Sequence, residues 1–152
     1  MIIAVEGNLF DHIHGAYATL ADTDGHVERY FSEELRKRYP ELHSLLEEQM
    51  RTQQPSLGDC YYIRMREDAP DLYTLVDHLE ADPDNLESCM SIMHEHSLRL
   101  GILDIGLSID IGFAGQEPAR ILSALSPIRD HSEQTATIYC PDPVELQRLR
   151  LQ

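Results

Sequence analysis

The sequence has almost no lysine and few basic residues of any kind. Among 152 residues, Lys37 is the only lysine, and 12 basic residues stand against 27 acidic ones, which gives a formal net charge of −15. Such a charge repels nucleic-acid backbones and anionic lipid surfaces at long range. We therefore expect no nucleic-acid partner held by bulk charge and no membrane partner. A small phosphorylated ligand is still compatible, because backbone N–H groups can hold phosphate without basic side chains.

Long apolar segments and paired cysteines are also missing. No apolar run approaches the roughly 18 residues that a membrane span needs, and residues 1–6 resemble a first strand rather than a signal peptide. The cysteines Cys60, Cys89 and Cys140 form no C-x-x-C pair, so a disulfide framework is not expected. These absences predict one soluble, cytoplasmic domain that spans residues 1–152.

Hydrophobic periodicity predicts an alternation of strands and helices. Apolar runs at 2–5, 102–109 and 134–140 and the alternating segment 59–65 are typical of strands. Residues 10–25 resemble a loop. Helices are expected in the segments that begin near Asp24, Leu42, Leu72, Pro83, Pro118 and Pro143.

This order of elements favours a three-layer α/β/α sandwich around a mixed central sheet. Ligands of open α/β sheets bind outside the carboxyl ends of the strands. Residues 7–26, 64–71 and 110–117 are therefore expected at one rim of the molecule.

Two histidine pairs, His12 with His14 and His94 with His96, invite comparison with metal sites. A helical zinc pair needs histidines four residues apart, and the members of both pairs are two apart. We therefore expect solvated or capping histidines, with no metal and no other cofactor. The sequence has no G-x-S-x-G motif, and its cysteines stand in apolar segments, where thiols are usually inert.

The segment Ile111-Gly112-Phe113-Ala114-Gly115 lies between a predicted buried strand and a helix opened by Pro118. Small residues let backbone N–H groups approach a phosphate closely, and the start of the helix adds a favourable dipole. A tight strand-to-helix turn gives the same pattern. The segment is thus compatible with a phosphate loop and with a simple turn.

Five segments in order resemble motifs of the macro-domain family, within the branch typified by the terminal ADP-ribose protein glycohydrolase. Ile3-Ala4-Val5-Glu6-Gly7-Asn8-Leu9-Phe10 is similar to the family's first strand and "GDL" turn. The other four are similar to the "F-x-x-x-F-P-x-L" helix, the second motif strand, the helix after it and the "sM-P-x-I-G-C-G" phosphate loop; they are residues 30–42, 57–63, 72–75 and 107–113.

The resemblance implies a macro-like fold and a ligand of the ADP-ribose type. It implies ligand contacts from the first turn and from two phosphate loops, at Gly7, Asn8, Leu9, Asp24, Gly25, Ile111, Gly112, Phe113, Ala114 and Gly115.

The sequence departs from the family pattern at several of these positions. Asn8 stands where the family has the aspartate that binds the adenine amino group, and its carbonyl oxygen could accept the same bond. Asp24 replaces a loop glycine, which puts a carboxylate beside a diphosphate. The catalytic lysine of the branch falls near Arg64, and its catalytic aspartate falls near Gln116 or Glu117. Arginine stays protonated and is a poor nucleophile.

Three functional hypotheses follow, with Arg64 and Glu117 as the candidate catalytic residues. The chain binds ADP-ribose or a related nucleotide without efficient turnover. Alternatively, it is a weak de-ADP-ribosylating hydrolase in which Glu117 activates a water. In the third hypothesis, a degenerate module contacts a protein partner or another small ligand.

Overall fold

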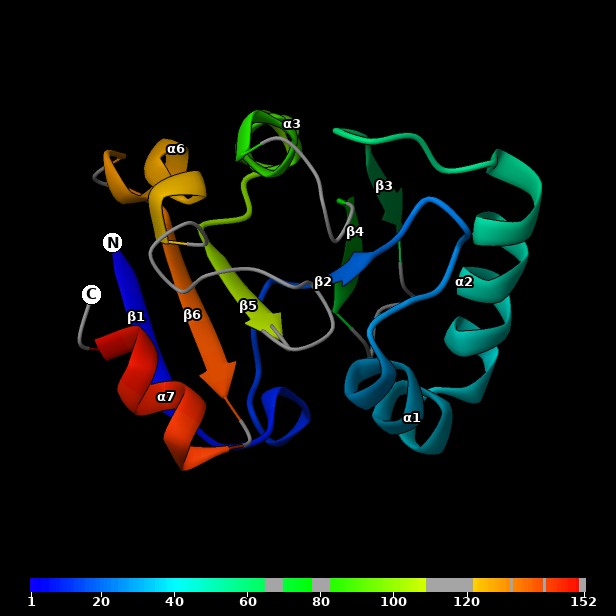
Figure 1. Cartoon of the computed structure of the whole chain (residues 1–152), viewed down its shortest axis with the longest axis horizontal. Coiled ribbons are helices and arrows are strands. Elements are labelled where there is room, and N and C mark those ends of the chain that lie inside the picture. The colour runs from blue at the N-terminus through cyan, green and yellow to red at the C-terminus, as the bar shows by residue number, and fades with distance from the viewer. Residues whose placement is uncertain (65–69, 78–82, 109–121, 132, 141, 151–152) are drawn as a thin grey trace.

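The computed structural model describes residues 1–64, 70–77, 83–108, 122–131, 133–140 and 142–150 (Figure 1). A six-stranded sheet in the order β1-β6-β5-β2-β4-β3 forms its centre, and of its pairings β3 with β4 is antiparallel while the rest are parallel. The strands are β1 (Ile2–Glu6), β2 (Ala16–Ala21), β3 (Cys60–Ile63), β4 (Asp71–Val76), β5 (Asp104–Ser108) and β6 (Thr135–Cys140). The helices are η1 (Leu9–Asp11), α1 (Arg29–Arg38), α2 (Pro40–Gln53), α3 (Pro83–Arg99), α6 (Ser126–Arg129) and α7 (Pro143–Arg150).

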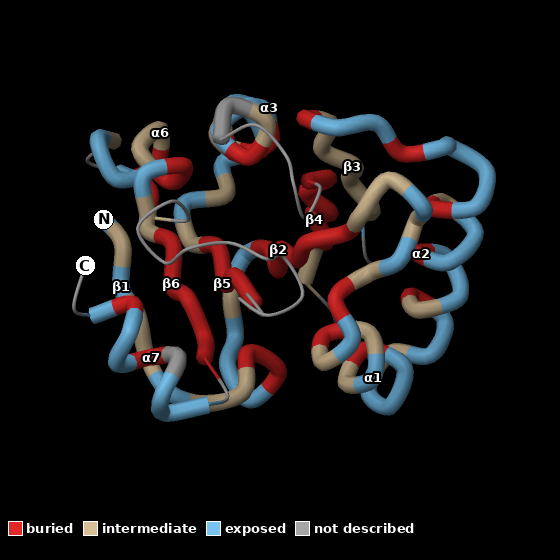
Figure 2. Tube along the Cα trace, in the orientation of Figure 1, coloured by how far each residue is buried: buried red, intermediate tan, exposed pale blue. Residues whose placement is uncertain are grey.

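Side chains alternate between two hydrophobic cores, one on each face of the sheet. In β5, Ile105 and Leu107 join the core under α3, α6 and α7. In β6, Tyr139 faces the opposite core, which η1, α1 and α2 cover. The central strands are buried and the outer surfaces of the helices are exposed (Figure 2). This arrangement confirms the predicted three-layer α/β/α sandwich with a mixed sheet.

Two strands occupy segments where the sequence predicts something else. Residues 16–21, expected in a loop, form β2, in which every residue is buried. Residues 72–76, expected in a helix, belong to β4. A strand buried on both faces has no polar alternation, so its periodicity does not separate it from a loop of small residues or a short helix.

The helix expected from Asp24 begins five residues later. Residues 22–26 form a tight turn in which Asp22 N–H donates to the carbonyl of His26. Helix α1 then starts at Arg29, and the side chain of Glu28 caps it.

Residues 7–15 cross the α1 face of the sheet on their way from β1 to β2. His14 Nδ1 lies 2.9 Å from Asp104 Oδ2, and His14 Nε2 lies 2.6 Å from the hydroxyl of Tyr139. A Cβ on Gly106 of β5 would clash with Leu9 Cδ1 and would meet His14 Cδ2 at 2.6 Å. Glycine at this position therefore lets the crossing segment lie directly on the sheet.

The second histidine pair also has hydrogen-bond partners. His94 Nδ1 lies 2.6 Å from Gln134 Oε1, and His96 Nδ1 lies 2.7 Å from the hydroxyl of Tyr73. Both bonds fasten α3 to neighbouring strands or their connections. His94 and His96 thus contribute to packing.

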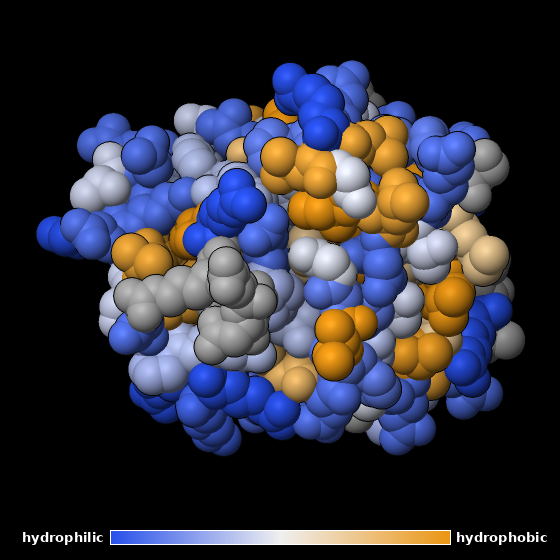
Figure 3. Space-filling view, turned by 180° about the vertical axis from the view of Figure 1, so that it is seen from behind, coloured by the Kyte–Doolittle hydropathy of each residue, from blue (hydrophilic) through white to orange (hydrophobic). Residues whose placement is uncertain are grey.

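The face of the molecule opposite to the one in Figure 1 is largely hydrophilic, with hydrophobic areas between the polar ones (Figure 3). The most exposed large apolar side chain in the described residues is Ile13, at 97%. None of the described helices is both long enough and apolar enough to cross a bilayer.

Two buried threonines offer a test of the core. Thr19 and Thr74 are direct neighbours in β2 and β4, and neither hydroxyl has a partner among the described residues. A buried hydroxyl without a partner costs free energy that an isosteric methyl does not. We expect Thr74→Val to leave the free energy of unfolding unchanged or to raise it by about 1 kcal/mol, as measured in urea.

Ser97→Ala is the matched control, because the hydroxyl of Ser97 is also fully buried but accepts a bond from Gln134 Nε2 at 2.7 Å. Its loss should lower the free energy of unfolding by about 1–3 kcal/mol. Equal losses in the two variants would contradict the assignment of Thr74 as unpaired.

Candidate functional site

Strands β2 and β5 separate at the carboxyl edge of the sheet. Among the described residues they pair through Ala16–Ala18 and Ile105–Leu107. After β2 the chain enters α1 and α2 on one face of the sheet, whereas after β5 it returns to β6 through α6 on the other face. Neighbouring parallel strands whose connections leave on opposite faces form the crevice in which open α/β sheets bind ligands. The candidate site is therefore the crevice beyond Leu20 and Ser108.

Glu28 lies where the two strands separate. Its backbone N–H donates to the carbonyl of Leu20 at 2.9 Å. Its carboxylate accepts from the N–H groups of Tyr30 at 2.8 Å and Phe31 at 3.1 Å, and from the hydroxyl of Ser108 at 3.3 Å. The residue is 0% exposed. The first free N–H groups of α1 are thus directed at a carboxylate of the chain itself.

The end of β1 brings the predicted Gly7, Asn8 and Leu9 to the same carboxyl edge. Gly7 has a φ of +136° and its N–H donates to the carbonyl of Cys140. Asn8 Oδ1 accepts from the N–H of Phe10, and Asn8 Nδ2 donates to Glu34 Oε2 at 3.2 Å. Asn8 therefore connects η1 to α1, while Leu9 is buried in the core.

Asp24 and Gly25, the predicted first phosphate loop, lie in the turn between β2 and α1. The side chain of Asp24 is exposed, and Gly25 has a φ of +84°. The turn borders a surface cavity of about 420 Å³ against the end of α2, which is lined by Thr23, Asp24, Gly25, Glu47, Met50, Arg51, Gln54 and Pro55. Asp24 lies in this turn and does not cap α1. The carboxylate that caps the helix is that of Glu28.

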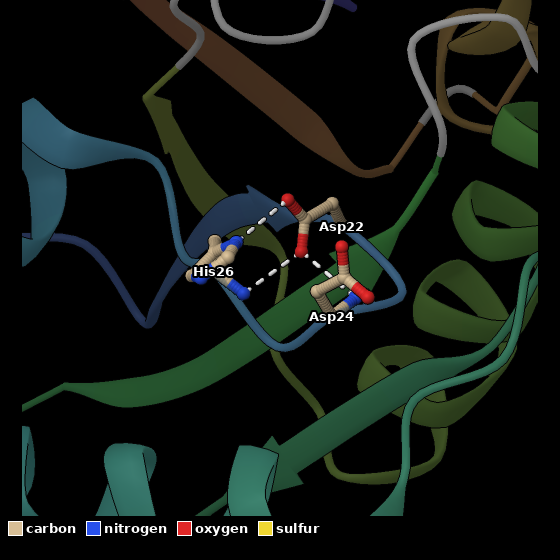
Figure 4. Close-up of side chains that lie close together, drawn as sticks. All are labelled: Asp22, Asp24 and His26. Atoms are coloured by element: carbon tan, nitrogen blue, oxygen red, sulfur yellow. Dashed lines mark hydrogen bonds and ion pairs between the residues drawn. The ribbon is translucent and has the colours of Figure 1, made fainter.

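Three side chains of this turn could together approach a cation. Ligand atoms of Asp22, Asp24 and His26 lie within 4.8 Å of one another, and the three side chains lie close together in the turn (Figure 4). Asp22 Oδ1 accepts from the backbone N–H groups of Asp24 and His26, and Asp22 Oδ2 lies 3.2 Å from His26 Nδ1. These bonds stabilise the turn, and both oxygens of the Asp22 carboxylate have hydrogen-bond partners in it.

Arg64 lies at the opposite edge of the sheet, contrary to the role considered for it. It follows β3, which is antiparallel to β4, and Ile63 pairs with Leu72 at the start of β4. The described residue that follows β4 at the crevice edge is Asp77, whose N–H donates to the carbonyl of Ala21. Arg64 therefore lies away from the crevice. The strand that does lead to the crevice, β4, was expected from the sequence to be a helix.

The remaining predicted residues, Ile111 to Gly115 together with Gln116 and Glu117, lie outside the described residues. Ile111 is three residues after Ser108 in the sequence, and Ser108 is where β5 reaches the crevice.

Glu28 was not among the residues predicted from the sequence. An acidic residue two positions before the apolar pair Tyr30 and Phe31 is a signal for a helix start. The nearer turn residues Asp24 and Gly25 gave a stronger signal, and they placed the start too early.

The thiols are packed rather than activated. Burial raises the pKa of Cys89 to about 12, and burial also raises the pKa of Cys60 above its usual range. Cys140 is fully buried in β6.

We therefore expect iodoacetamide at pH 8 to leave Cys89 unmodified in the folded protein, because about one thiol in 10⁴ is ionised four pH units below its pKa. In 8 M urea the same residue should react readily. Peptide mapping by mass spectrometry reads both states, and fast labelling of folded protein would show that the thiol is exposed.

Comparison with known proteins places this geometry in a structural class. No protein-family model matches the sequence, and no curated protein matches it. Solved structures do match. The macrodomain of Mycobacterium tuberculosis DarG has 17% identity and a TM-score of 0.77, over 93% of this chain and 99% of that one.

Two further matching structures are described as complexes with a nucleotide. The Trypanosoma brucei macrodomain in complex with ADP has 17% identity and a TM-score of 0.78, over 99% of this chain and 67% of that one. Thermosipho africanus DarTG in complex with ADP-ribose has 12% identity and a TM-score of 0.73, over 97% of this chain and 46% of that one. Over nearly its whole length, the chain therefore has the macrodomain fold.

Proposed function

We propose that the chain is a macrodomain-like module that binds ADP-ribose or a related nucleotide in the crevice beyond β2 and β5, without efficient turnover. The observation that carries this proposal is the coincidence of two findings. The crevice stands at the point where connections leave on opposite faces. Structures of the same fold are described as complexes with ADP and ADP-ribose.

Backbone groups must hold any phosphate in this crevice. The chain carries a net charge of −15, and the described acidic residues at the edge include Glu28 and Asp77. N–H groups of a glycine-containing loop supply local positive potential that bulk charge does not. The segment from Gly112 to Gly115, which follows β5, is the proposed phosphate loop.

Turnover through a lysine adduct does not fit this chain. Its one lysine, Lys37, lies in the last turn of the ten-residue helix α1, with a side chain that is 66% exposed. Eight residues of helix, or about 12 Å, separate it from the first residue of α1. Water activation by Glu117 is the remaining hydrolytic route considered.

The first test is calorimetry with ADP-ribose, which we expect to bind the wild-type chain. Gly115→Val should abolish this binding while the domain stays folded, because a branched side chain would stand where the phosphate approaches the loop. Leu100→Val is the control, since Leu100 is exposed and follows α3 at the amino edge of the sheet. Wild-type silence at millimolar ligand would favour the protein-contact hypothesis, and equal binding by the folded Gly115→Val variant would move the phosphate site elsewhere.

The second test concerns hydrolysis. Release of ADP-ribose from a glutamate-modified peptide should be undetectable under single-turnover conditions, and Lys37→Ala should not change the result. Robust release by the wild type would overturn the proposal of a binding module. A loss of that release in Glu117→Gln would then identify the hydrolase alternative.

A further inference from the structure

Helix α1 begins at the crevice, and its first N–H groups already have an anionic partner. An anion at a helix start binds through the free amides of the first turn and through the helix dipole. In α1 the amides of Tyr30 and Phe31 both donate to the carboxylate of Glu28, one to each oxygen. A carboxylate therefore occupies the position that a phosphate oxygen would need.

The carboxylate is also held from the other side of the crevice. Ser108, the last residue of β5, donates its hydroxyl to Glu28 Oε2 at 3.3 Å. The backbone of Glu28 bonds to Leu20 of β2. Side-chain and backbone bonds from both strands and from the helix thus fix a fully buried residue in one place.

Resting on the function proposed above, we propose that Glu28 determines the ligand specificity of this crevice by excluding a phosphate from the start of α1. Two effects act together. The side chain fills the volume in front of the amides, and its negative charge repels a second anion strongly in a site shielded from water. Neutral parts of a nucleotide, such as its base and ribose, are not subject to this repulsion. Ligands that present no phosphate to α1 are therefore favoured over those that do.

Replacement of Glu28 separates volume from charge. In Glu28→Gly the amides of α1 are free and the position is empty, and glycine is well tolerated before a helix. We expect its affinity for ADP-ribose and for ADP to exceed that of the wild type at least tenfold, with the affinity for adenosine unchanged. Glu28→Gln keeps the volume and removes the charge, so its gain should be smaller. Calorimetry at matched ionic strength measures all three ligands.

Glu33→Gln is the matched control. Glu33 lies on the exposed side of the same helix, where it pairs with Arg29. The substitution Glu33→Gln replaces the same type of side chain as Glu28→Gln. It should leave the affinities for ADP-ribose, ADP and adenosine unchanged. Thermal melting checks each variant, and Glu28→Ser, with a short side chain that caps the helix, replaces the glycine variant where that one does not fold.

The outcomes separate this proposal from the proposed function. A tenfold gain in Glu28→Gly, with a smaller gain in Glu28→Gln and none in Glu33→Gln, supports the role of Glu28. This holds even where the wild type does not bind ADP-ribose and the proposed function fails. Wild-type binding of ADP-ribose with no gain in folded Glu28 variants overturns the role of Glu28 and leaves the proposed function intact. Silence of every folded protein toward ADP-ribose overturns both.

Discussion

The separation of β2 and β5 after a short run of pairing is the constraint from which the rest of the site follows. Two parallel strands that diverge leave carbonyl groups at their inner edges that need donors. The N–H of Glu28 supplies one to Leu20, and the hydroxyl of Ser108 is joined to the carboxylate of the same residue. One residue thereby closes the sheet and starts α1. The separation of the two strands creates the crevice, and Glu28 of the chain itself occupies the position between them.

A second set of contacts holds the connection between β1 and β2 against the sheet, on the face that α1 covers. The connection from β1 to β2 passes over Gly106, and His14 spans from Asp104 at the start of β5 to Tyr139 near the end of β6. Asn8 and Glu34 join the beginning of this connection to α1. The beginning of the connection is therefore hydrogen-bonded to the helix whose first turn Glu28 caps.

The sequence predicted elements whose patterns are local and failed where burial removed the pattern. The terminal helix was expected at residues 143–150 and is found there, and the strands around 102–109 and 134–140 are also confirmed. The strand Ala16–Ala21 was missed because small buried residues carry no alternation. The misread strand Asp71–Val76 then shifted the expected catalytic position to Arg64, at the wrong edge. Both segments are strands because they pair with each other over a long sequence separation. Local periodicity does not reveal such pairing.

The fold and the chemistry of the crevice depend on different residues, so the macrodomain fold can persist at low sequence identity while the residue at the start of α1 changes. The sheet is stabilised by parallel pairings and two cores to which Leu107 and Tyr139 contribute from opposite faces. The charge at the start of α1 depends on Glu28 alone among the described residues that cap the helix. A cap substitution costs about 1 kcal/mol of stability, which a core of this size absorbs. The same substitution removes a carboxylate from a buried site, where polar groups act most strongly on a ligand. Ligand preference in this scaffold can therefore diverge through single residues at the strand ends, without any change in the packing that defines the fold.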